Sequence, residues 1–295
     1  MMNLLLESGA SLELPMIIYP NDALCFALNQ RCSPQIILLL CHQYAKMGLN
    51  HLHKGTLSVA VRSKYDRQES VVISRIIQEA MPGLTVVSHS YQVVRAWQGF
   101  LYGIGDTEEE GEDRNLIWSK ILLRMGADIN MKMESKGPTG LQRAIHFGQI
   151  KLAKYLLEEG AEIQVPATTF VGTPLQEAIL AEELELAYTL LERGADVNAP
   201  GSYFTTLQAA ARTGNINIAV ELLRRGAHVA AEGDGMTAIN TAAKYGREDM
   251  LQLLLDHYYG NKYLRHVCQD AAIHAKRERH LEIAEWLQGY VVPKL

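Results

Sequence analysis

The feature that most constrains this chain is a short segment that returns at a nearly fixed interval. The pattern Leu-Leu-x-x-Gly-Ala-x-Ile/Val occupies residues 122–129, 156–163, 190–197 and 222–229, and its glycines lie 34, 34 and 32 residues apart. A period in this range is typical of stacked helical repeats, in which one unit cannot bury its apolar face without neighbours. We therefore expect function on a surface rather than in an enclosed pocket.

A second marker keeps step with the first. Thr-x-Leu or Thr-x-Ile is followed, five residues after the threonine, by alanine, and this pattern opens at Thr139, Thr173, Thr205 and Thr237. These residues resemble the ankyrin repeat, whose pattern opens with Thr-Pro-Leu-His-x-Ala and closes with Leu-Leu-x-x-Gly-Ala-x-Val-Asn. The resemblance implies an all-α fold, an ankyrin-repeat α-solenoid of stacked helix-turn-helix units. At the position of the family's histidine this chain has amides, so the side chain that would brace neighbouring threonines is of a different kind. These amides are Gln142, Gln176, Gln208 and Asn240.

Each unit can also be interpreted from its residues. Thr173 suits the N-cap of a first helix, with Pro174 at the first helical position, where its missing N–H costs nothing. A glycine that tolerates positive φ follows the first helix at 148, 214 and 246, whereas Glu182 breaks this rule. The second helix is predicted over 150–159, and Gly160 ends it as a C-terminal cap.

The repeat frame organises the whole chain. With the alanine as anchor, weaker units open at Asp22, Gly55, Tyr91 and Asp270, so that eight repeats cover residues 22–290. We predict one array over 1–295, divided as follows: a partial repeat over 1–15, degenerate repeats over 16–113 with an acidic insertion near 106–113, regular repeats over 114–260, and a C-terminal capping repeat over 261–295.

Two features of the N-terminal half leave alternatives open. Residues 4–12 match only the tail of a repeat, which suggests a fragment of a longer protein or dimerisation through exposed leucines. The acidic insertion matches part of a calcium-loop template, but Ile117 stands where the bidentate carboxylate is needed. A flexible, solvated loop is the favoured interpretation.

Composition excludes several classes of function. The chain has 295 residues, is 48% hydrophobic and carries a formal net charge of −5, which gives no general attraction to nucleic acid. It has no apolar run long enough to span a membrane and no plausible secretory leader. We predict an intracellular protein, cytoplasmic or nuclear, with no nucleic-acid or membrane partner.

No motif indicates catalysis or a cofactor. The chain lacks a nucleophile elbow and a phosphate-binding loop, so we expect no enzyme, no cofactor and no small-molecule substrate. Cys41, His42, His51 and His53 could supply zinc ligands, but no tight Cys-x-x-Cys pair accompanies them, and no metal is predicted. The resemblance also implies possible hydroxylation at Asn130 or Asn198, although both residues suit a turn on structural grounds.

The resemblance implies that partners are gripped by the loop tips before each threonine and by the exposed side of the first helix. Carried over by position, the candidate residues of this row are Lys136, His146, Phe147, Phe170, Phe204, Arg212, Met236, Lys244 and Tyr245. The row mixes aromatic, Met and basic residues, the types that dominate interface energy. In the opposing interpretation, Phe170 and Phe204 merely fold over their own loops.

The resulting hypothesis is a non-enzymatic scaffold that binds a protein partner along the concave face of its repeats. The aromatic residues serve as anchors, and Arg212 and Lys244 select acidic neighbours. The competing hypothesis makes these repeats the targeting or regulatory portion of a longer protein, with a ubiquitin-ligase adaptor or an enzyme module upstream.

Overall fold

The computed structural model describes residues 109–258 apart from Met125, 133–135 and Ser202, then residues 263–290, and a few positions between 27 and 101. The chain groups into two compact units, Met1–Ala161 and Glu162–Leu295. The described residues form helices joined by turns, with two isolated β-bridges and no strand. Residues 41, 42, 51 and 53, which could supply zinc ligands but are not predicted to bind a metal, lie outside the described residues.

The first unit contains α7 (Glu109–Arg124), α8 (Gly140–His146) and α9 (Ile150–Glu158), and α9 packs against both of the others. Trp118 and Leu156 are buried in its core. The interpretation of 106–113 as a loop is wrong for 109–113, which form the start of α7. Acidic residues stabilise the start of a helix because its N-terminal end carries partial positive charge.

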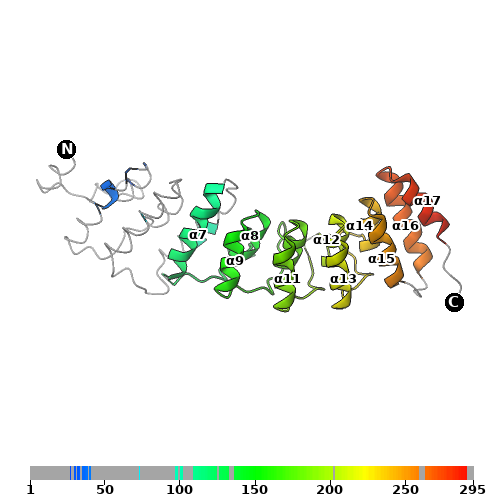
Figure 1. The fold of residues 1–295 in the computed structure, drawn as a ribbon, viewed down its shortest axis with the longest axis horizontal. Helices are drawn as coiled ribbons and strands as arrows, with labels where there is room; N and C mark the ends of the chain where they lie inside the picture. Colours follow the sequence, from blue (N-terminus) through cyan, green and yellow to red (C-terminus); the bar gives the residue numbers. More distant parts are fainter. Residues whose placement is uncertain are drawn as a thin grey trace, which may run out of the picture. The chain divides into compact units, whose positions relative to one another are not determined.

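The second unit is a series of helical hairpins, drawn from green to red in Figure 1. The first helix of each hairpin packs on the first helix of the next, so that α10, α12, α14 and α16 form one layer, and each also packs on its own second helix. The hairpins are α10 (Pro174–Leu180) with α11 (Leu184–Glu192), α12 (Thr206–Thr213) with α13 (Ile216–Arg224), α14 (Ala238–Lys244) with α15 (Glu248–Tyr258), and α16 (Leu264–Arg277) with α17 (Leu281–Gly289). The predicted all-α helix-turn-helix architecture is confirmed.

Two of the amides that replace the family's histidine, Gln176 and Gln208, brace neighbouring repeats. The backbone N–H of Thr205 donates to Gln208 Oε1 at 2.7 Å, and the backbone N–H of Gln208 donates to Thr205 Oγ1 at 3.1 Å, which completes a capping box. The same amide reaches the following loop, where its Nε2 donates to the carbonyls of Gly233 at 3.0 Å and Met236 at 2.7 Å. One buried side chain thus caps its own helix and holds the next loop.

The turns between paired helices use positive φ, as predicted. Gly214 has φ of 80°, and Glu182, which occupies the equivalent place after α10, is forced to 59°. The predicted opening of the last unit at Asp270 is wrong, because α16 begins at Leu264 after the cap residue Tyr263, and Asp270 lies inside the helix. The predicted anchoring alanine of this unit, Ala275, is nevertheless fully buried, as the anchoring position requires.

On the outer loops, Asn198 ties two successive repeats together. Its Nδ2 donates to the carbonyl of Gly226 at 2.9 Å, and its Oδ1 accepts from the backbone N–H of His228 at 2.9 Å. Its own backbone N–H donates to Asp196 Oδ1 at 2.8 Å. Gln164 makes the same bracket one repeat earlier, to Gly194 and Asp196. These contacts give the Asn198 side chain a structural role that needs no modification.

Candidate partner-binding surface

The loop before α10 exposes an aromatic side chain. The backbone N–H of Thr168 donates to the carbonyl of Val171 at 2.7 Å, and the backbone N–H of Val171 donates to Thr168 Oγ1 at 3.1 Å. These two bonds close a tight turn with Phe170 at its tip, where the side chain is 78% exposed. Phe170 is therefore not folded over its own loop, in contrast to the opposing interpretation.

The loop before α12 carries two adjacent aromatic residues with different environments. Tyr203 is 46% exposed, whereas Phe204 is half-buried. Sequence reasoning selected Phe204 and missed Tyr203. The repeat pattern carries no signal for Tyr203, because its exposure depends on the path of the loop that precedes the cap residue Thr205.

The loop before α14 is a hairpin with a two-residue connection. Gly233 and Met236 exchange backbone hydrogen bonds of 3.0 and 3.1 Å, and Asp234 and Gly235 between them have φ of 53° and 69°. Positive φ at both central residues is the geometry of a type I′ turn, for which Asp-Gly is a favoured sequence. Met236 is half-buried at the base of this hairpin, not at its tip.

A row of alternating cations and rings connects α12 with α14. The guanidinium of Arg212 lies 5.5 Å from the ring centroid of Phe204 and 5.6 Å from that of Tyr245. Lys244 Nζ lies 5.8 Å from the same Tyr245 ring. Cations at these distances are attracted to the ring faces. Four residues predicted for the site are thereby in one contiguous patch, with Arg212 exposed and the other three half-buried.

The patch continues onto α16, which sequence reasoning did not include. Burial, and then the charges of Arg277 and Lys244, hold the pKa of His274 below its usual value, while Asp270 and Glu278 act in the opposite direction. The helices α14 and α16 pack against each other, and Lys244 on α14 and Arg277 on α16 thus act on the same imidazole. Their common register with Arg212, each two residues after the anchoring alanine, is a signal that the sequence contained.

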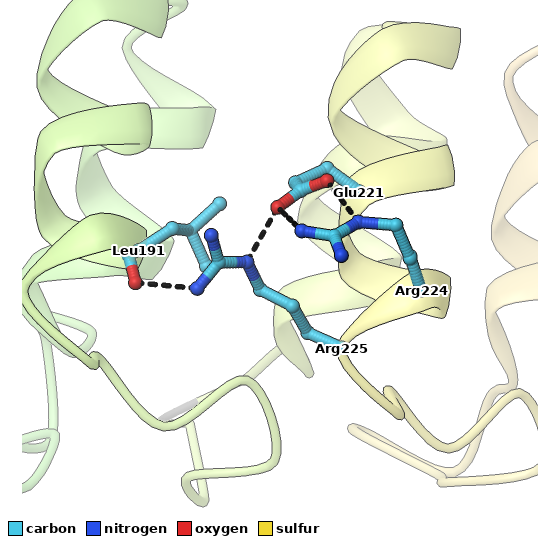
Figure 2. Close-up of polar contacts among 4 residues, drawn as sticks. All are labelled: Leu191, Glu221, Arg224 and Arg225. Atoms are coloured by element: carbon cyan, nitrogen blue, oxygen red, sulfur yellow. Dashed lines mark hydrogen bonds and ion pairs between the residues drawn. The ribbon is translucent and has the colours of Figure 1, made fainter.

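The basic residues of α13 are arranged differently. Figure 2 shows Glu221 held by Arg224 in a two-point ion pair, with both contacts at 2.8 Å, and by Arg225. These hydrogen bonds lower the pKa of Glu221 to about 2. Arg225 also donates to the carbonyl of Leu191 at the end of α11, at 2.6 Å. The cations at the end of the second helix are thus engaged in internal contacts.

The remaining candidate residues belong to the first unit. Lys136 is exposed in the loop before α8. At the end of α8, the rings of His146 and Phe147 meet edge to face with centroids 5.0 Å apart, and the guanidinium of Arg143 lies 4.7 Å from the Phe147 ring centroid. Phe147 thus has the same kind of cationic neighbour as the aromatic residues of the second unit.

A small hollow in the second unit lies among the outer loops and is mainly apolar, with Val165, Pro166, Leu175 and Pro200 in its wall. Of the polar residues that line it, Gln164 and Asp196 take part in the bracket between repeats described above, and Thr173 caps α10. It therefore offers few polar groups to orient a ligand, and the cation–ring patch is the stronger candidate site.

Comparison with known proteins identifies the repeats. A family model described as ankyrin repeats (3 copies) matches residues 114–201 and 202–266, more than half of the chain. No curated protein matches the sequence. In the part of the chain that the structure describes, no helix combines the length and the apolar character needed to cross a bilayer.

Proposed function

Since this chain belongs to the ankyrin repeat family, whose repeats generally act as protein–protein interaction modules and are typically non-catalytic, we propose that it is a scaffold that binds a protein partner through its loop tips and first helices. In the second unit this surface comprises the cation–ring patch together with the aromatic loop tips. No nucleic acid, small-molecule substrate or cofactor takes part in the proposed function.

The observation that carries this proposal is the exposure of Phe170. A phenylalanine that is 78% exposed at a loop tip contributes little to the core of its own unit. Tyr203 at the next loop tip is also exposed, at 46%. Aromatic side chains on a hydrogen-bonded framework bind with a small loss of conformational entropy, which is why such residues become hot spots.

The proposal is tested by photo-crosslinking in the native cell. A photoreactive phenylalanine analogue at position 170 is compared with the same analogue at position 220, where Val220 is 46% exposed on α13. We expect a discrete cross-linked protein at 170 that is missing at 220. Equal cross-linking at both positions, or none at 170, contradicts the proposed surface.

The captured partner then allows a quantitative test. Replacing Phe204→Ala and Tyr245→Ala together is expected to weaken its binding by about 2–4 kcal/mol, because both rings are lost from the centre of the patch. Far-ultraviolet circular dichroism should show unchanged helicity, since neither ring is fully buried. Unchanged affinity in a folded double variant rejects the site.

A further inference from the structure

Three basic residues occupy one register position on three successive first helices. Arg212, Lys244 and Arg277 each lie two residues after the buried alanine that anchors their repeat, close to the C-terminal end of α12, α14 or α16. The carbonyl end of a helix favours cations, and this accounts for a single basic residue at each end. This preference does not explain why the three cations lie next to one another on neighbouring helices.

The side chains between the three cations join them into one row. Arg212 and Lys244 both contact the ring of Tyr245, at 5.6 and 5.8 Å from its centroid. Lys244 and Arg277 occupy the same register position on α14 and α16, which pack against each other, and the charges of both lower the pKa of His274. The row therefore runs from α12 across α14 to α16, and its last members lie beyond residue 266, where the match to the family model ends.

These cations lack internal counter-charges. Among the residues that the structure describes, no carboxylate lies within ion-pair distance of Arg212, Lys244 or Arg277. On α13, by contrast, Glu221 neutralises Arg224 and contacts Arg225. Two carboxylates act to raise the pKa of His274: Asp270, whose Oδ2 lies 3.6 Å from His266 Nε2, and Glu278. A row of like charges without partners, in a chain of net charge −5, is a local site for an anion.

The side chain of Arg212 is prepared for such a ligand. Its guanidinium contacts two rings, Phe204 and Tyr245, and these contacts restrict its rotamers before a partner arrives. The planar fork of a guanidinium matches a carboxylate or phosphate with two parallel hydrogen bonds. Arg212 as a whole is exposed to solvent, as a residue that meets a partner must be.

We propose that this row binds an acidic segment of the protein partner in polyproline II conformation, with anionic side chains three residues apart that meet Arg212, Lys244 and Arg277 in turn. Packed helices lie about 8–10 Å apart, and three residues of a polyproline II segment make one turn that spans about 9 Å, so side chains three residues apart lie on one face. The spacing of the helices therefore selects a spacing of charges. This inference rests on the proposed function and names the chemistry of the partner.

The test uses two dye-labelled peptides of identical composition and charge, Glu-Gly-Ser-Glu-Gly-Ser-Glu and Gly-Ser-Glu-Glu-Glu-Gly-Ser, titrated with the full chain by fluorescence anisotropy at low salt. We expect the spaced peptide to bind at least about fivefold more tightly, because only its charges can reach all three cations. A third peptide with phosphoserine at the central position separates phosphate from carboxylate recognition. Equal affinity for the spaced and clustered peptides overturns the proposal, because it indicates unspecific charge attraction.

A substitution on α13 provides a matched control for substitutions in the row. Lys244→Gln and Arg277→Gln should each weaken the spaced peptide about tenfold, the scale of one charge-assisted hydrogen bond. Arg224→Gln makes the same change of net charge on α13 and should alter binding less than about twofold. An equal loss of peptide affinity in all three variants contradicts binding at the row. Circular dichroism of each variant confirms that the fold is intact.

The His274 resonance gives an independent readout. A bound anion offsets the charges of Lys244 and Arg277, so the pKa of His274 measured by NMR should rise when the spaced peptide is added. An unchanged pKa contradicts binding at this row. A cross-linked partner at position 170 whose affinity is insensitive to salt and to Lys244→Gln would leave the proposed function standing and remove this inference alone.

Discussion

The first position of α12 offers a substitution whose effect can be worked out from the structure. Thr206 is fully buried, and its Oγ1 has no hydrogen-bond partner. In α10 the same position is Pro174. The preceding cap residues have nearly the same backbone, with φ, ψ of −74°, 162° at Thr205 and −64°, 159° at Thr173. Extended backbone of this kind is what a following proline requires.

Thr206→Pro should therefore stabilise the chain. Proline at the first helical position gives up an N–H that has no intrahelical acceptor, and the smaller entropy of the unfolded chain contributes about 0.4–1 kcal/mol. Removing a buried hydroxyl without a partner contributes about 1 kcal/mol or more, and the change in packing around the ring offsets part of this. We expect a net gain of about 1–2 kcal/mol in the free energy of unfolding.

Urea unfolding followed by circular dichroism measures this gain, and two variants separate its causes. Pro174→Thr makes the reverse exchange in α10 and should destabilise by a similar amount. Thr206→Ala removes the hydroxyl without adding the ring. Its free energy of unfolding should therefore gain the contribution of the removed buried hydroxyl and lose about 0.8 kcal/mol for the missing methyl group. If Thr206→Pro and Pro174→Thr both lower stability, the two positions are not equivalent and the reasoning from the repeat register is refuted.

Three further predictions test the framework. Asn198→Ala removes both side-chain bonds to the Gly226–His228 loop and should cost about 1–3 kcal/mol in urea unfolding; a loss below about 0.5 kcal/mol contradicts the bracket. Ala210→Leu places a larger side chain in a fully buried site between first helices and should cost about 1–3 kcal/mol while preserving the helical spectrum; a stability equal to that of the native chain shows unfilled space there. Because the folded pKa of Glu221 is depressed from 4.5 to about 2, its ion pairs contribute stability above pH 4.5 that is lost as pH falls towards 2; Glu221→Gln should flatten the pH dependence of unfolding in this window, and an unaltered slope rules out these pairs as its cause.

The architecture could be predicted from the sequence because each unit repeats the same local physics. Thr173 and Thr205 cap helices as their side chains dictate, and the glycine at 214 adopts the positive φ that the turn needs. The errors arose where the repeat pattern is weakest. Asp270 looked like a cap residue by spacing alone, but α16 extends to Leu264 because the segment before it continues a helical pattern of buried residues.

The candidate surface was less predictable, since its composition is not constrained by folding. Arg212, Lys244 and Tyr245 could be selected by register, and the structure brings them together with Phe204. Tyr203 was missed because its exposure depends on the path of its loop, which no repeat pattern specifies. Arg277 was missed because the last repeat had been interpreted only as a solvated cap.

The replacement of histidine by glutamine explains how such a surface can vary without loss of the fold. Gln208 satisfies the N–H of Thr205 and two carbonyls of the next loop by itself, so the buried polar groups at this junction need no help from the exposed side chains. Gly233 allows this close approach, because a Cβ there would lie 2.4 Å from Gln208 Oε1. The loop tips are thus held by buried bonds, while Tyr203 and Arg212 above them remain available for recognition. A partner that binds this surface meets side chains on a framework that is already ordered, so less of its binding free energy is lost in ordering the repeats.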